Sequence, residues 1–113
     1  MRSMTIDLPA ASGVLVNYAG CLTVHSTRET SGTAAAVYRL WDGSTNEGTL
    51  LLPVSLAISE STRDDFYNHH IVFRTGLYYE LVSGTIEGSV SVLVDHDCNE
   101  ILEVLLHEIA GQA

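Results

Sequence analysis

The chain has 113 residues, a formal net charge of −9, and 46% hydrophobic but only 17% charged residues. This length fits a single domain, and the charged share lies below the ~25% of average globular domains. The basic residues are five arginines without any lysine, so no basic patch is expected that could bind nucleic acid or an anionic membrane surface. Because a small domain exposes much of its surface, the shortage of charge favours burial of part of that surface against partners.

The N-terminal region and the cysteines indicate where the protein is made. Asp7 and Pro9 interrupt any apolar run, so no signal peptide is predicted. No stretch approaches the ~18 apolar residues of a membrane span. Cys21 and Cys98 are too few for a disulfide framework and match no zinc spacing. The sequence therefore predicts a soluble protein with two reduced thiols, made in a cytosol.

The first third of the chain shows strand-like alternation interrupted by turn residues. Residues 1–12 are predicted to form an N-terminal arm with a short strand over 4–8. Between residues 14 and 26 the even positions are the more apolar set, which makes them the expected core face. Gly20 within this run predicts a bulge or bend, or two strands end to end. Residues 27–33 are a loop by composition.

The middle third predicts a strand pair. Over residues 34–41 the even side chains are expected to point inward, and Val37, Arg39 and Trp41 outward. Turn residues over 42–48 lead to residues 50–58, whose even positions are all aliphatic. Proline cannot donate to a strand ladder, so Pro53 predicts an edge strand or a bulge.

The last third contains the strongest strand pattern. Residues 59–68 are predicted to be a polar loop that can hold a helical turn, and residues 69–75 a short strand. In residues 76–94 two alternating halves flank Gly84 and Gly88, which can supply positive φ for a reversal. The sequence predicts a β-hairpin over this range.

The tail changes period. Apolar residues recur at helical spacing between Ile101 and Ile109. Asn99 is a candidate N-cap and Gly111 a candidate C-terminal stop. An amphipathic helix is predicted over 98–113, with a final strand over 101–106 as the alternative. Its apolar face is expected to dock on the same subunit or on a neighbouring one.

Strand-length runs separated by turn signals roughly every 10 residues are typical of an all-β protein. The predicted fold is a small antiparallel β-sandwich or jelly-roll-like barrel of about seven or eight strands with a C-terminal helix. The expected division is an N-terminal arm over 1–12, a β-sandwich domain over 13–97 and the helical tail over 98–113.

Motifs for catalysis are weak throughout. His107-Glu108 would need a second histidine at position 111 to form a zinc-protease motif, and that position is glycine. The run 95–98 carries metal-binding residue types, but neighbouring strand residues point to opposite faces. No Gly-x-Ser-x-Gly nucleophile elbow is present. We therefore predict no catalytic residue, metal or cofactor, and a protein that is not an enzyme.

The clearest functional signal is a predicted partner interface. Trp and Arg are enriched at binding hot spots, and Trp41 and Arg39 are expected on one outward face. The alternative is that Trp41 folds back over the edge of the core. The predicted interface consists of Val37, Arg39, Trp41, Leu102, Leu106 and Ile109.

Two stretches support a family resemblance. Residues 27–43 contain a strand, Asp-Gly, strand unit, and residues 76–94 contain Gly-Leu-Tyr-Tyr, Ser-Gly-Thr and Ser-Val-Ser-Val. Together they resemble segments of small structural proteins of tailed-bacteriophage virions. The resemblance implies a non-enzymatic capsid decoration, head spike or tail-associated protein in the virion, assembled in the host cytoplasm. It also implies a homo-oligomer, with a trimer favoured, that contacts other virion proteins such as major capsid or tail proteins.

Two other classes of function stay open. One is a carbohydrate- or peptide-binding module in which Trp41, Tyr67 and Tyr78 serve as aromatic platforms. The other is a small metal-dependent enzyme that uses His69, His70 and His96.

Overall fold

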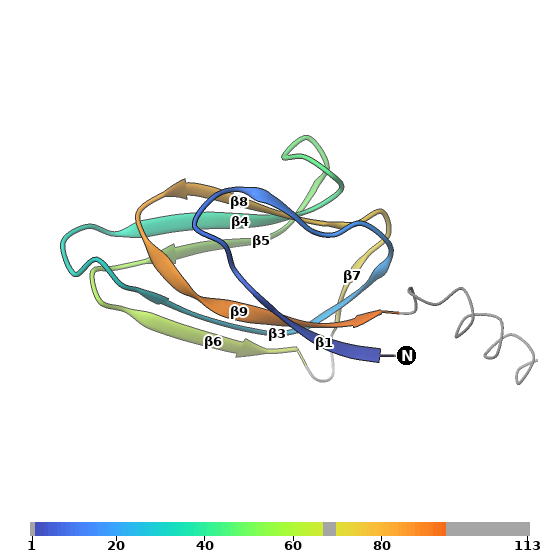
Figure 1. Ribbon diagram of the computed structural model, residues 1–113, viewed down its shortest axis with the longest axis horizontal. Coiled ribbons are helices and arrows are strands. Elements are labelled where there is room, and N and C mark those ends of the chain that lie inside the picture. Colours follow the sequence, from blue (N-terminus) through green and yellow to red (C-terminus); the bar gives the residue numbers. More distant parts are fainter. Residues whose placement is uncertain (1, 67–69, 95–113) are drawn as a thin grey trace, which may run out of the picture.

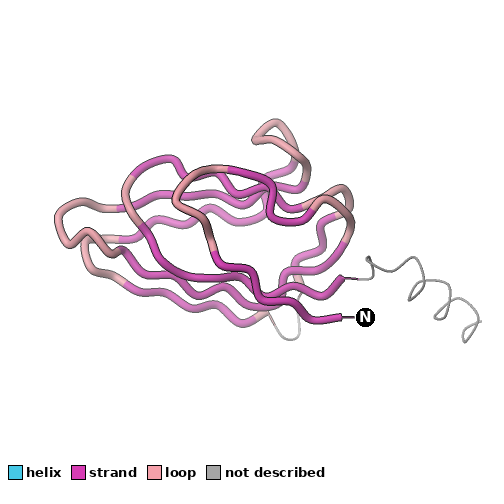
Figure 2. The backbone as a smooth tube through the Cα atoms, viewed as in Figure 1, coloured by secondary structure: helices cyan, strands magenta, loops and turns pink. Residues whose placement is uncertain are grey.

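The computed structural model describes residues 2–66 and 70–94. Over these residues the chain forms nine strands and no helix, and the strands make two antiparallel sheets packed face to face (Figure 1, Figure 2). The expected all-β class is confirmed. The predicted helix over 98–113 lies outside the described residues. None of the described segments is a helix of the kind that could cross a bilayer.

The first sheet has the strand order β1-β9-β3-β6, and β7 also pairs with β3. β6 and β7 occupy successive parts of the same side of β3. The strands of this sheet are β1 (Arg2–Asp7), β9 (Ile86–Val94), β3 (Gly20–Glu29), β6 (Ser61–Asp65) and β7 (Ile71–Phe73).

The second sheet has the order β2-β8-β4-β5. Its strands are β2 (Gly13–Val16), β8 (Leu77–Ser83), β4 (Ala36–Asp42) and β5 (Thr49–Leu56). The predicted strand pair over residues 34–58 is confirmed as β4 and β5. β5 is an edge strand, as Pro53 predicted, because a strand that lacks one N–H donor is best tolerated at the edge.

The core lies between the inner faces of the two sheets. Period-2 alternation places one set of side chains from each strand there. Burying each large aliphatic or aromatic side chain contributes about 1.5–3 kcal/mol. The fully buried apolar residues are Leu22, Ala36, Tyr38, Leu40, Phe73, Leu77, Tyr79, Val90, Val92 and Val94.

The two strands predicted over residues 76–94 are confirmed, but the prediction that they pair with each other as a hairpin is wrong. β8 lies in the second sheet and β9 in the first, so the two strands face each other across the core (Figure 1). The connection is tight, and Gly84 in it has a φ of 85°. Alternation shows which face of a strand is buried and does not show which strand lies beside it.

A bulge in β3 changes which residues face the core. The β3–β9 register shifts between Leu22 and Val24, so Thr23 is the extra residue. Beyond it the odd positions become buried, namely His25, Thr27 and Glu29. The predicted even core face therefore ends at Leu22, because one inserted residue reverses the alternation. The predicted loop over 27–33 begins later, since β3 continues to Glu29.

Two further bulges turn predicted core residues outward. Val14 pairs with Tyr78 and Val16 with Leu77, so a residue is inserted between them on β2. Likewise Trp41 pairs with Leu50 and Leu40 with Leu52 on β5. As a result Val14 and Leu50 are 46% and 42% exposed. Ile58 lies beyond the end of β5 and is also exposed.

Two segments predicted to be an arm and a loop contain strands of the first sheet. The predicted arm over 1–12 contains β1, which pairs with β9 along its whole length. The predicted polar loop over 59–68 contains β6, which pairs with β3 from Ser61 to Asp65. Polar residues can occupy an edge strand, because its outer side meets water. These segments bring the described strands to nine, against the seven or eight expected.

Candidate functional site

The outer face of the second sheet collects the exposed aromatic and aliphatic side chains of four strands. We call this surface the aromatic face. Its cross-strand register aligns side chains that come from distant parts of the sequence. The aromatic face consists of Val14, Val37, Arg39, Trp41, Leu50, Pro53, Tyr78, Glu80 and Val82.

One row of this face runs across the whole sheet. Val14 pairs with Tyr78, Tyr78 with Trp41, and Trp41 with Leu50. Side chains directly opposite on one sheet face lie about 4.5–5.5 Å apart at Cβ, so these four form a continuous apolar strip. Its two ends, Val14 and Leu50, are the more exposed members. Contiguous exposed apolar surface of this kind marks interaction sites.

A cluster of polar side chains lies beside the strip. Glu80 lies at the centre of this cluster. Its Oε1 accepts a hydrogen bond from the indole N–H of Trp41 at 3.1 Å, and its Oε2 accepts one from the side-chain amide of Asn46 at 2.8 Å. Nη1 of Arg39 lies 3.5 Å from the same carboxylate. The Asn46 and Trp41 hydrogen bonds hold the pKa of Glu80 below its usual value. Glu80 therefore stays charged and orients Trp41 on the outer face, so this indole does not fold over the edge of the core.

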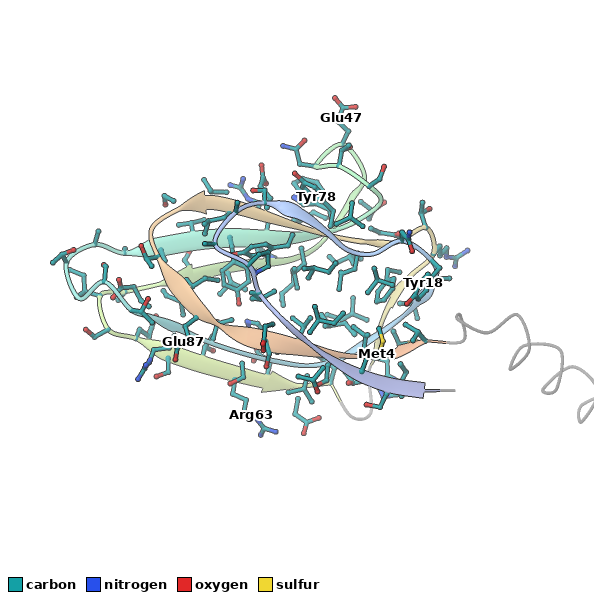
Figure 3. All side chains as sticks on the ribbon, in the orientation of Figure 1. Met4, Tyr18, Glu47, Arg63, Tyr78 and Glu87 are labelled. Atoms are coloured by element: carbon teal, nitrogen blue, oxygen red, sulfur yellow. The ribbon has the colours of Figure 1, made fainter. Side chains whose placement is uncertain are left out.

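The other outer face of the sandwich has a different chemistry. The register places small hydroxyl side chains of β1, β9 and β3 side by side, and we call this surface the hydroxyl face. The Thr5 and Ser91 hydroxyls lie 3.2 Å apart, and the Thr23 hydroxyl donates to the Ser91 carbonyl at 3.0 Å. Figure 3 shows Tyr78 and Arg63 on opposite outer sides of the molecule. The hydroxyl face also carries a short apolar row of Leu93, Cys21 and Val72. Among the described strands, the outward-facing aromatic side chains Trp41 and Tyr78 lie on the aromatic face.

A polar cluster lies inside the sandwich. His25 is fully buried, and its Nδ1 lies 3.0 Å from the Asp64 carboxylate at the rim. The Tyr38 hydroxyl lies 2.8 Å from that of Thr27. The rings of His25 and Tyr38 are 5.9 Å apart, and those of Tyr38 and Tyr79 are 5.7 Å apart. These tilted contacts are favourable aromatic geometry.

Burial controls the protonation of this cluster. It lowers the pKa of His25, and the nearby Asp64 carboxylate opposes this shift. Burial also raises the pKa of Tyr38, and it raises that of Tyr79 to about 12. All three side chains are therefore neutral near pH 7. Because His25 and both rings have no exposed surface, the cluster has no access for a substrate and serves as part of the core.

Two carboxylates hold loops in place. Glu29 accepts hydrogen bonds from the Ser31 hydroxyl, from the Ser59 N–H at 2.7 Å and from the Gly32 N–H at 3.0 Å. The Ser31 and Ser59 bonds lower the pKa of Glu29 to about 2. The carboxylate thereby ties the loop after β3 to Ser59, which has a positive φ of 61°. Its role is structural.

Asp42 plays the same part at the other end of the sandwich. Its carboxylate accepts backbone N–H groups of Arg74 and Thr75, each at 2.9 Å. Partial burial raises its pKa, but these hydrogen bonds outweigh the burial and the net shift is downward. This carboxylate fixes the chain between β7 and β8.

The structure brings together half of the predicted interface. Val37, Arg39 and Trp41 share the aromatic face. The other three predicted residues, Leu102, Leu106 and Ile109, lie outside the described residues. Sequence reasoning also missed Val14, Leu50, Glu80 and Asn46 as members of this surface. Alternation over 77–82 indicates Glu80, which shares a strand face with Tyr78. It does not indicate Val14 and Leu50, because bulges reverse their phase.

The predicted histidine site is not brought together among the described residues. His70 is exposed in the segment before β7. His69, His96 and the aromatic Tyr67 lie outside the described residues. Within 2–66 and 70–94 no group of three or more metal-binding side chains converges.

Comparisons with known proteins leave the family open. No protein-family model matches the chain, and no curated protein is significantly similar to it in sequence.

Proposed function

We propose that the protein is a non-enzymatic structural component of a tailed-bacteriophage virion, which associates with its own copies and docks on other virion proteins. The observation that carries this proposal is the aromatic face, an apolar strip across four strands on an otherwise acidic chain. Trp, Tyr and Arg are the side chains enriched in interface hot spots. This face contains one Trp, one Tyr and one Arg, in Trp41, Tyr78 and Arg39.

The strand order supports the proposal. In the sheets β1-β9-β3-β6 and β2-β8-β4-β5, strands from the start of the chain lie beside strands from its end, such as β1 beside β9 and β2 beside β8. β6 and β7 share one position beside β3. We interpret this order as an eight-position jelly roll. Jelly rolls occur in viral capsid and lectin domains. Because one fold serves many functions, a jelly roll only limits the possible classes of function. The aromatic face is the feature that favours a docking protein among these classes.

Charge defines the expected partner. The chain carries a net charge of −9, so a partner surface that is neutral or basic around an apolar centre is favoured. The same charge repels packaged nucleic acid. Both properties suit a protein that contacts other coat or tail proteins.

Two matched variants test the docking surface. Val14 on the aromatic face and Val72 on the first sheet are valines in short strands, 46% and 55% exposed. In a density gradient of phage particles, the wild type and Val72→Asp are expected to sediment with the particles. Val14→Asp is expected to remain at the top, because it places a charge in the apolar strip. Loss of the wild type from the particle fractions, or equal behaviour of the two variants, would contradict the proposal.

A second candidate function is carbohydrate binding. Trp41 and Tyr78 are neighbours on the aromatic face, and the side chains of Arg39, Asn46 and Glu80 lie beside them. Aromatic rings with adjacent polar groups form platforms for amphipathic ligands. On a glycan array this candidate predicts binding that is lost in Tyr78→Ala and kept in Val72→Ala. A wild-type protein that binds no glycan removes it.

A further inference from the structure

The edges of the two sheets differ in how they are protected. An edge strand presents unpaired N–H and C=O groups, and natural proteins block such edges with charges, proline, bulges or short strands. Among the described strands, β6 carries Arg63, Asp64 and Asp65, and β5 carries Pro53. β7 has three residues, and β2 has four residues with a register shift. Each of these edges has a feature that discourages pairing with another strand.

β1 has only one of these features, a charged residue at each end, Arg2 and Asp7. It is six residues long and contains no proline. Its register with β9 runs without a shift from Arg2, opposite Val94, to Asp7, opposite Ser89. The residues between these ends, Ser-Met-Thr-Ile, carry no charge. Among the described strands β1 pairs with β9 alone, so none of them occupies its other side.

We propose that β1 pairs antiparallel with β1 of a second copy of this chain, so that the two first sheets join into one. The inference rests on the self-association part of the proposed function and names the surface that performs it. With a two-fold axis perpendicular to the sheet, the core-facing side of β1 in one copy lies on the same side of the joined sheet as the core-facing side of β1 in the other copy. The pairing can centre on Met4 or on Thr5, since β1 spans residues 2–7.

The sequence of β1 complements itself in both registers. When the axis lies at Met4, Ser3 faces Thr5 of the other copy, and Met4 faces Met4. When it lies at Thr5, Met4 faces Ile6 and Ser3 faces Asp7. In each case hydroxyl side chains extend the hydroxyl face and apolar ones extend the inner face. Neither register sets two like charges directly opposite each other, which cross-strand pairing disfavours.

This self-complementarity favours a second copy over an unrelated strand. A foreign strand would have to match both faces of β1, whereas a copy does so by symmetry. Two-fold pairing is isologous and closes at two subunits, so it predicts a dimer where the resemblance favours a trimer. Since each copy carries a charge of −9, added salt is expected to strengthen the dimer by screening the repulsion.

Charge substitutions at Thr5 test the pairing. Thr5 lies close to its symmetry mate in both registers, at about 4.5–8 Å. Thr5→Glu and Thr5→Lys each set like charges together, and each is expected to weaken the dimer more than about tenfold in sedimentation velocity. An equimolar mixture of the two is expected to dimerise again. Ser91→Ala removes the same hydroxyl contact with Thr5 without touching the edge, and it is expected to dimerise like the wild type.

Hydrogen exchange on the full chain gives a readout that does not depend on a variant. The amides of β1 that point away from β9 are expected to exchange at least about tenfold more slowly at high than at low protein concentration. Three results would overturn the inference: a monomer at high concentration, a dimer whose β1 amides do not change, or dimers that both Thr5 variants retain. The gradient experiment with Val14→Asp probes the other sheet. Particle binding can therefore fail while the dimer still forms, and the dimer can fail while particle binding is kept.

Discussion

Gly84 shows how a single residue directs the topology. At this position the chain leaves β8 and crosses to the other sheet with a φ of 85°. A Cβ atom there would lie 2.6 Å from the Ala35 carbonyl oxygen and 2.6 Å from the Ala36 Cα. Both conditions favour glycine, because other residues rarely adopt this φ and the backbone leaves no space.

We therefore expect Gly84→Ala to destabilise the protein by about 1–3 kcal/mol in urea unfolding. Gly13→Ala is the matched control, since a Cβ at Gly13 meets nothing within 4 Å, and it is expected to have little effect. Equal losses in both variants would show that the turn at Gly84 is not under this constraint.

His25 predicts a dependence of stability on pH. Burial lowers its pKa below the 6.5 of an exposed histidine, so the unfolded chain takes up a proton at a higher pH than the native chain does. The free energy of unfolding should consequently fall as the pH drops below about 6.5. Glu29 contributes little in this window, because its carboxyl is ionised there in both states, with a pKa of about 2 in the native chain and an ordinary value of 4.5.

The measurement is urea unfolding at about pH 7.5 and about pH 5.5, on either side of the ordinary histidine pKa. The wild type is expected to be less stable at the lower pH. His25→Phe keeps an aromatic ring against Tyr38 and cannot titrate, so it should lose most of this difference. A wild type that is equally stable at both values would contradict the account of His25.

At the scale of elements, the sequence predicts which strands exist better than where they lie. Alternation identifies the apolar positions of β4, β8 and β9, and the structure confirms them. Alternation does not identify the neighbouring strands of β8 and β9, because a strand that faces another across the core has the same apolar pattern as a strand that lies beside it. Strand neighbours depend on contacts between distant residues, which a local pattern does not contain.

Bulges explain why the predicted core faces of β2, β3 and β5 are partly wrong, and they also create the candidate site. Inserted residues on β2 and β5 turn Val14 and Leu50 outward, where they extend the strip formed by Tyr78 and Trp41. The bulge on β3 turns His25 inward. A bulge adds one residue without a distinctive sequence signal, so half of the apolar strip could not be predicted from alternation.

The pairing of β8 and β9 can be tested by hydrogen exchange. Each of these strands has a neighbour on both sides, β2 and β4 for β8, and β1 and β3 for β9. We expect slow exchange at consecutive amides along both strands and faster exchange in β6 and β7. An isolated hairpin would instead leave every second amide of each strand fast, and that result would contradict the two-sheet arrangement.

At the scale of the whole molecule, the two proposed interactions use different sheets. The aromatic face contains the apolar strip and the hot-spot residue types, and the hydroxyl face is bordered by the unprotected edge of β1. Joining copies through β1 would leave the aromatic faces of both copies open to other proteins, since β1 and the aromatic face belong to different sheets. Self-association and docking can therefore occur together.

We have proposed that the protein is part of a phage particle. The most direct test of this proposal is electron microscopy of purified particles labelled with gold-conjugated antibodies against the protein. If the protein is a virion component, gold is expected at a fixed place on the particles, at the capsid, neck or tail. Gold that is absent from intact particles, while the protein is abundant in the particle-free lysate, would contradict it.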